Sequence, residues 1–238
     1  SMIQAAFLFR PQAPLPCRST RNRGLDVLVS AGRSRFPALM LKNENGDYDR
    51  VEIYNNKKDA EPLVRVIDGE FHPLVVTEVA AGDEKIKATR HFTIVKIDPK
   101  GESVIVSAGS ALAIEGERTY SNWKPESLYQ QTVDIAGYVP HAIGVGGGYP
   151  EMISRRSLPS WDVFEKWQAK ALLGLIEQND YDAVFTHIHN CDHIGHPCWR
   201  WAKTRAKYGY NDEKVYQGFL EEVYFQCDDY IRQCPLCQ

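Results

Sequence analysis

Short apolar runs, each bounded by turn-forming residues, recur between Phe36 and Glu117 and constrain the fold of this stretch. The runs at 38–41 and 51–54 flank Asn45, Gly46 and Asp47, which is a β-hairpin signature. Further runs of the same kind lie at 63–66, 74–79, 91–97 and 103–107. Because none of these runs has helical periodicity, the sequence predicts a small antiparallel sandwich or barrel-like sheet over 36–118.

The hydrophobic pattern changes after Tyr120. Ser160 precedes apolar residues at helical spacing, which predicts an amphipathic helix over 160–178, and a second such helix is expected over 212–233. The apolar run 183–186 between them is typical of a buried strand. Helix, buried strand, polar loop and helix together predict an α/β unit of parallel-sheet type, in which ligands bind at the carboxyl ends of the strands.

These patterns divide the chain into four expected segments. They are an irregular lead-in over 1–35 with one short strand at 25–30, a β-rich module over 36–118, a Gly- and Pro-containing connector over 119–159, and an α/β segment over 160–238. The expected fold class is therefore α+β, with an antiparallel β module followed by an α/β segment.

Composition argues against several classes of protein. With 28 Lys and Arg against 31 Asp and Glu, the chain lacks the excess of positive charge that supports nucleic-acid binding. No apolar run approaches the roughly 20 residues that span a bilayer, so we expect no membrane-spanning segment. Six cysteines are too few for a disulfide scaffold, and no signal peptide is recognisable, so we expect a cytoplasmic protein with reduced thiols.

A histidine-rich loop follows the predicted strand at 183–186. It contains His187, His189, His193 and His196 together with Asp192. Imidazole nitrogens and carboxylate oxygens are suitable ligands for zinc or manganese, and one loop can bring several of them to one point. The sequence therefore predicts a metal site in this loop.

Residues 187–196 resemble two families of metal-dependent hydrolases. The pattern His187-x-His189-x-x-Asp192-His193 is similar to the metallo-β-lactamase motif, with one additional residue before the aspartate. Asp192-x-x-x-His196, with Gly195 before the histidine, resembles instead the signature of the alkaline phosphatase superfamily, in its type I phosphodiesterase/nucleotide pyrophosphatase branch. The order of elements over 150–233 also agrees with that branch, which makes it the preferred interpretation.

The second resemblance implies a function and a set of ligands. It implies a fragment of a metal-dependent phosphoesterase or phosphodiesterase, in which Asp192 and His196 hold one of two zinc or manganese ions and a small phosphate ester is hydrolysed by in-line displacement at phosphorus. His187, His189 and His193 are then further ligands or hydrogen-bonding neighbours of the ligands. The resemblance places the Thr or Ser nucleophile before residue 1 and the remaining ligands after residue 238, so we expect the isolated chain to be inactive. The resemblance also implies an alkaline-phosphatase-like fold for the α/β segment, with residues 36–118 as a cap-like insert.

Two alternatives remain open from the sequence. The chain is a non-catalytic cap or binding module if the histidine loop has only a structural role. At the end of the chain, Cys234 and Cys237 have the C-x-x-C spacing of a zinc knuckle or redox pair, but no fourth ligand is evident beside them and Cys227. Cys191 and Cys198 flank the loop, and we expect them to be small buried apolar groups.

Overall fold

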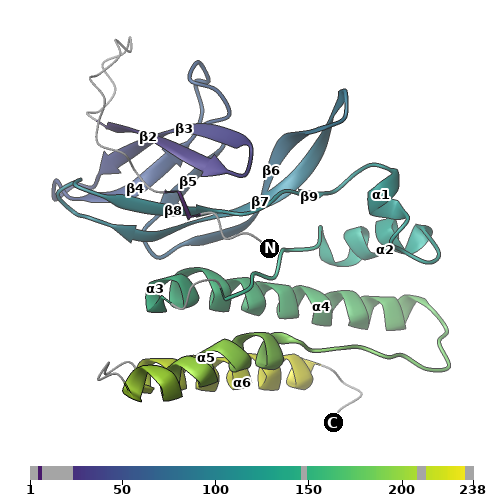
Figure 1. Ribbon diagram of the computed structural model, residues 1–238. Helices are drawn as coiled ribbons and strands as arrows, with labels where there is room; N and C mark the ends of the chain where they lie inside the picture. Colours follow the sequence, from purple (N-terminus) through teal and green to yellow (C-terminus); the bar gives the residue numbers. More distant parts are fainter. Residues whose placement is uncertain (1–4, 7–23, 146–148, 208–212, 234–238) are drawn as a thin grey trace. The chain divides into compact units, whose positions relative to one another are not determined.

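The computed structural model describes residues 5–6, 24–145, 149–207 and 213–233, and it has a mixed α+β fold with two antiparallel sheets (Figure 1). The chain divides into two compact units, residues 1–112 and 113–238. None of the helices in the described ranges is long and apolar enough to cross a membrane.

The first unit consists of two antiparallel sheets. One sheet has the order β2-β3-β4-β5, formed by β2 (Leu25–Ala31), β3 (Ser34–Lys42), β4 (Tyr48–Ile53) and β5 (Val64–Ile67). The other has the order β1-β8-β7-β6, formed by β1 (Ala5–Ala6), β8 (Val104–Ala108), β7 (Glu84–Ile97) and β6 (Phe71–Ala81). The short β9 (Leu112–Ala113) pairs with β7. These sheets confirm the predicted antiparallel β module.

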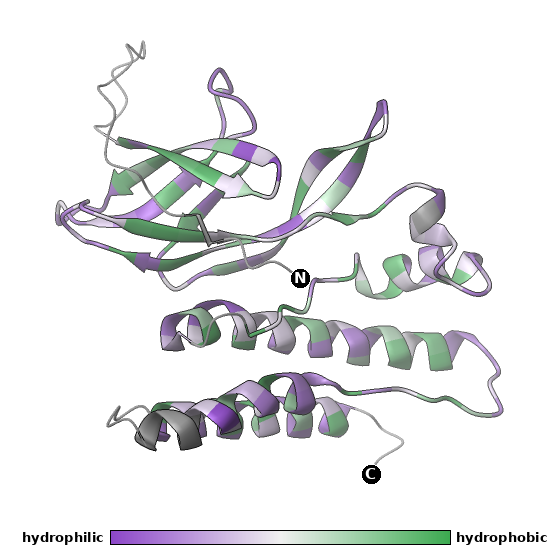
Figure 2. Cartoon of the chain, viewed as in Figure 1, coloured by the Kyte–Doolittle hydropathy of each residue, from purple (hydrophilic) through white to green (hydrophobic). Residues whose placement is uncertain are grey.

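The core of the first unit lies between the inner faces of the two sheets. Alternate residues of β2 and β3 are buried, among them Val29, Phe36 and Met40, as expected for strands with one face in a core. They pack with Phe92 and Ile94 of β7, and the Phe36 and Phe92 rings meet edge to face at 5.6 Å. Figure 2 shows the corresponding alternation of apolar and polar residues along the strands.

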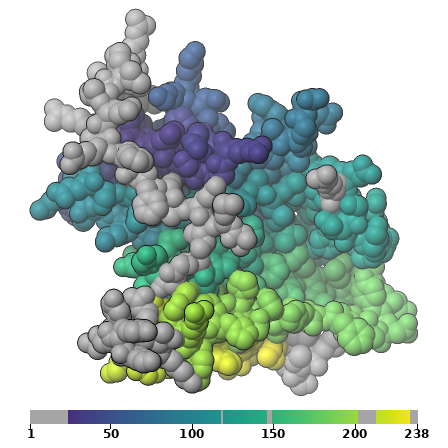
Figure 3. Space-filling model, viewed as in Figure 1, coloured from purple at the N-terminus to yellow at the C-terminus, as the bar shows by residue number. Residues whose placement is uncertain are grey.

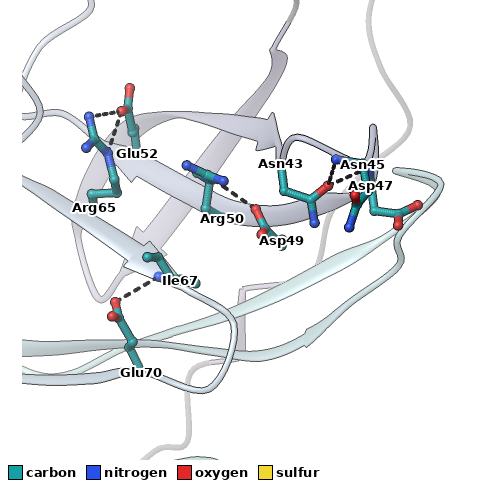
Figure 4. A network of polar contacts seen from close by, with 9 residues as sticks. All are labelled: Asn43, Asn45, Asp47, Asp49, Arg50, Glu52, Arg65, Ile67 and Glu70. Carbon is teal, nitrogen blue, oxygen red and sulfur yellow. Dashed lines mark hydrogen bonds and ion pairs between the residues drawn. The ribbon is translucent and has the colours of Figure 1, made fainter.

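Polar contacts set the turns and edges of the first sheet (Figure 4). The Oδ1 atom of Asn43 accepts hydrogen bonds from the backbone amides of Asn45 (3.0 Å) and Asp47 (3.1 Å), and Gly46 between them has a φ of 89°. This is the turn predicted from the Asn-Gly-Asp sequence. Between neighbouring strands, Arg65 donates to the nearly buried carboxylate of Glu52 at 2.6 and 2.8 Å.

The second unit is helical. Its elements are α1 (Glu117–Tyr120), α2 (Ser127–Ala136), α3 (Pro150–Met152), a π-helical turn η1 (Ile153–Ser157), α4 (Leu158–Gln178), α5 (Asn190–Lys207) and α6 (Glu213–Gln233). Trp161 of α4, Ile194 and Cys198 of α5, and Tyr216 and Val223 of α6 form its core. The helices predicted over 160–178 and 212–233 are thus confirmed as α4 and α6.

The predicted buried strand at 183–186 is wrong. In the structure, residues 183–189 form an irregular, extended connection between α4 and α5 (Figure 1), and Phe185 is 96% exposed. A strand requires a neighbour for its backbone hydrogen bonds, and all described strands lie within residues 5–113. For the same reason the described part of the second unit is an arrangement of packed helices and not the parallel-sheet α/β segment that the sequence predicted.

Two predicted segments have a different content from that expected. The strand expected at 25–30 is β2, which pairs with β3 from Leu25 onward, so the β unit begins within the stretch expected as an irregular lead-in. The expected connector over 119–159 contains α2 and the helical turns from Pro150 to Ser157. Residues 146–148 of its glycine-rich part lie outside the described residues, as do Cys234 and Cys237.

The exposure of Phe185 leads to a test of this fold. Phe185→Ala should change the free energy of unfolding by less than about 0.5 kcal/mol, because the ring loses almost no packing. The matched substitution Phe92→Ala should cost about 3–5 kcal/mol, because Phe92 is fully buried. Urea unfolding followed by circular dichroism measures both, and a large loss for Phe185→Ala would contradict the exposed connection.

Candidate metal-binding site

Asp192 and His196 lie one turn apart in the first half of α5. The i to i+4 spacing places both side chains on one face of the helix, and the Nε2 atom of His196 is 3.0 Å from Oδ1 of Asp192. Both side chains are largely exposed, and Figure 3 shows the α5 region, in light green, at the surface on the face drawn. The polar loop predicted here is wrong, because residues 190–207 form the helix α5. The structure nevertheless brings together the two residues that the sequence selected as metal ligands.

His189 approaches the same carboxylate from the chain just before α5. Its Nε2 atom lies 3.5 Å from Oδ2 of Asp192, so the two oxygens of Asp192 face different imidazoles. The Nδ1 atom of His189 is buried and has no hydrogen-bond partner among the described residues. Because His189 faces the free oxygen of Asp192, it is the best placed of the remaining histidines to act as a further ligand or to orient the aspartate.

His193 and His187 have different surroundings. The His193 ring packs against Trp161 at 5.4 Å and against His189 at 5.7 Å between ring centroids. Burial lowers the pKa of His193, the neighbouring His189 lowers it further, and Asp192 opposes both. The exposed His187 lies in the irregular connection, with its ring 4.9 Å from that of His189. His193 is exposed as well, but its ring lies against Trp161, so we assign it to packing, whereas His187 remains a candidate neighbour of the site.

The opposite side of α5 anchors this exposed face to the core. Asn190 is fully buried, its Nδ2 atom donates to the carbonyl of Val223 at 3.4 Å, and its Oδ1 atom accepts from the amide of Cys191 at 2.7 Å. Ile194 and Cys198 follow at intervals of four residues, and both are buried. Asp192 and His196 fall between these anchors and therefore project to solvent. The expectation of a buried, apolar role is confirmed for Cys198.

The sequence did not predict that Gly144 and Arg156 lie near the histidine cluster. Arg156, within the π-helical turn, is 95% buried and donates to the carbonyl of Gly144 at 2.9 Å. Gly144 leaves room for the His193 ring, since a Cβ atom at this position would lie 2.9 Å from Nε2 of His193. The glycine-rich sequence could have indicated a close approach of the backbone to a side chain, although we interpreted it only as part of a connector. Nothing in the sequence pattern distinguishes Arg156 from a solvated arginine.

The described residues provide two close ligands for a cation but not a complete cage. Within the described ranges, no group of three or more His, Cys, Asp or Glu side chains is arranged to hold a metal ion. The metallo-β-lactamase pattern requires His187, His189, Asp192 and His193 to converge, whereas His193 packs on Trp161 and Asp192 faces His196. Four-coordinate zinc bound by Asp192 and His196 would therefore need two further donors.

A carboxyl group of α4 is buried. Glu165 of α4 is 3% exposed, and neither of its carboxylate oxygens has a hydrogen-bond partner among the described residues. Burial, with a smaller effect from Asp162, raises the pKa of Glu165 to about 7. In the folded chain this side chain is therefore mostly protonated below about pH 7.

This pKa makes the stability of the chain depend on pH in a predictable direction. Because the folded pKa of Glu165 is above the unfolded value of 4.5, stability falls as the pH rises from 4.5 to about 7, by up to roughly 3 kcal/mol. Glu165→Gln should remove this loss. The stability of the variant relative to the parent chain should therefore be higher at pH 8 than at pH 4, where the glutamate is mostly protonated in both the folded and the unfolded chain. Urea unfolding at both pH values measures the effect, with Glu177→Gln, an exposed position of α4, as the control. Equal differences at the two pH values would contradict the assignment.

Comparisons with protein-family models, curated proteins and solved structures found no match to this chain. The function of the α5 face must therefore be inferred from its own residues and their geometry.

Proposed function

We propose that Asp192 and His196 are two ligands of a divalent metal centre in a metal-dependent phosphoesterase or phosphodiesterase similar to the alkaline phosphatase superfamily. The observation that carries this proposal is the exposed pair itself, with 3.0 Å between Nε2 of His196 and Oδ1 of Asp192. The proposal includes the fold of that superfamily for the complete protein, and a reducing, cytoplasmic compartment, in line with the free thiols of Cys191, Cys198 and Cys227.

The chemistry of the two side chains fits zinc or manganese. One imidazole nitrogen and one carboxylate oxygen are ligands that both metals accept, and an i to i+4 pair on a helix presents them in a defined geometry. The open side of the pair leaves space for further protein ligands and for a phosphoryl oxygen of the substrate. When bound there, the metal ions would stabilise the charge on the attacking and leaving oxygens during displacement at phosphorus.

The surrounding residues of this chain position the pair. Asn190, Ile194 and Cys198 attach α5 to the core, which sets the direction of the exposed face. His189 faces the second oxygen of Asp192 and limits the rotation of that carboxylate. Such neighbours hold ligands in the orientation that metal binding requires, and their loss typically weakens metal binding.

Binding of zinc tests the ligand assignment. Because the described residues bring only two strong donors together, the isolated chain should bind zinc weakly, and Asp192→Ala or His196→Ala should weaken binding by at least about tenfold. His72→Ala is a matched control, because His72 forms another exposed histidine–carboxylate pair, with Glu70, at 3.1 Å. Isothermal titration calorimetry measures the three variants. Zinc binding that persists unchanged in both α5 variants would show that Asp192 and His196 are not metal ligands.

Hydrolysis of phosphate esters tests the proposed reaction. With zinc or manganese supplied, the 238-residue chain should show no turnover of p-nitrophenyl phosphate, bis-p-nitrophenyl phosphate or a phenylphosphonate ester, because the resemblance places the nucleophile outside it. The complete gene product should hydrolyse at least one of them, and Asp192→Ala should lower its rate by several orders of magnitude. The proposal fails if this substitution leaves the rate of the complete product unchanged. Turnover by the 238 residues alone would instead show that the nucleophile lies within them.

A further inference from the structure

Two thiol groups from different helices are in contact behind the exposed face of α5. Cys191 lies in the first turn of α5 and Cys227 lies in α6, and their Sγ atoms are 3.4 Å apart. The two residues are separated by 36 positions in the sequence, so their contact results from the packing of α5 against α6. Both are free and partly exposed, which leaves them accessible to a small reagent.

We propose that Cys191 and Cys227 form a reversible disulfide bond that links the first turn of α5 to α6, with a small disulfide compound as the oxidant. In the first step, Sγ of Cys191 attacks one sulfur of the compound, whose S–S bond breaks, and the proton of Cys191 leaves with the released thiol. In the second step, Sγ of Cys227 attacks Sγ of Cys191, and the second thiol departs with the proton of Cys227. Two protein thiols lose two electrons and two protons, and the small disulfide gains them as two thiols.

Asn190 holds the two cysteines in the arrangement that this reaction requires. Its buried Oδ1 atom accepts hydrogen bonds from Sγ of Cys227 at 2.9 Å and from the backbone amide of Cys191 at 2.7 Å. Oxidation removes the thiol proton of Cys227 and with it the first of these bonds, whereas the bond from the Cys191 amide does not involve a thiol. The buried oxygen therefore has a donor before and after oxidation, and neither state leaves it unsatisfied.

The environment of Cys227 assigns different roles to the two thiols. Burial raises the pKa of Cys227 to about 12, and the hydrogen bond with Cys191 and the negative charge of Glu165 act in the same direction. Cys227 is therefore a neutral thiol at pH 7 and a poor first nucleophile. This supports Cys191 as the thiol that captures the oxidant and Cys227 as the thiol that completes the disulfide.

Peptide mapping of the oxidised chain tests the proposal. The folded chain is incubated with oxidised glutathione in the presence of EDTA, the remaining thiols are blocked with iodoacetamide, and the protein is digested with trypsin without reduction. We expect a linked pair of peptides, 171–200 and 215–232, which dithiothreitol separates. Peptide 171–200 contains both Cys191 and Cys198, so tandem mass spectrometry of the linked pair identifies the bonded residue.

Matched variants distinguish the two candidate partners of Cys227. Cys191→Ala should reduce the linked peptides at least about tenfold, whereas Cys198→Ala should leave them unchanged, because Cys198 is fully buried. If either variant does not fold, tandem mass spectrometry of the unsubstituted chain decides the assignment by itself. A link from Cys227 to Cys198, or glutathione adducts at Cys191 without any link, would overturn the proposal.

This inference does not depend on the proposed phosphoesterase function. EDTA keeps metal ions away from Asp192 and His196 during the oxidation, so a chain that binds no zinc can still form the link. Conversely, failure to form the disulfide leaves the zinc-binding measurement unaffected.

Discussion

The position of every candidate site residue depends on how the first turn of α5 is anchored. Asn190 is fully buried and bonds to the carbonyl of Val223 in α6 and to the amide of Cys191. An unsatisfied amide side chain in the core would cost on the order of 1–3 kcal/mol, so these hydrogen bonds strongly favour one position of α5 on α6. Ile194 and Cys198 continue the buried stripe, and the spacing leaves Asp192 and His196 on the exposed side. The exposed pair of Asp192 and His196 and the contact between Cys191 and Cys227 therefore both depend on how this helix is anchored.

Glu165 and Arg156 are buried side chains of the helical unit that carry a charge in water. Glu165 has no hydrogen-bond partner for its carboxylate oxygens among the described residues, and Arg156 donates to the carbonyl of Gly144. Burial raises the pKa of Glu165 to about 7 and lowers that of Arg156, because a low-dielectric environment disfavours either charge. Groups of this kind are frequent near functional sites, although they also occur in structural networks. In this unit, Glu165 makes the stability of the folded chain depend on the pH of the solution.

The β unit was predicted well because the periodicity of its strands and the residues of its turns are visible in the sequence. Alternating burial in β2 and β3, and the Asn43 turn before β4, arise from side-chain periodicity and local hydrogen bonds that the sequence displays directly. The run 183–186 has neither an alternating pattern nor a turn sequence that would define a partner strand. A short apolar run is compatible with a buried strand or an exposed connection, and only the presence of a neighbouring strand distinguishes them. Among the described residues no strand pairs with it, and Phe185 remains exposed.

The sequence by itself determined the antiparallel β module and the helices α4 and α6, because each follows from local periodicity. It indicated a polar loop where the structure has α5, so the placement of Asp192 and His196 one helical turn apart came from the structure. Only the tertiary structure decided which histidines face Asp192 and which pack on Trp161. It also decided the contact of Cys191 with Cys227 and the burial of Glu165. These features depend on the packing of α4, α5 and α6 against one another, which relates residues far apart in the chain and has no signature in local spacing.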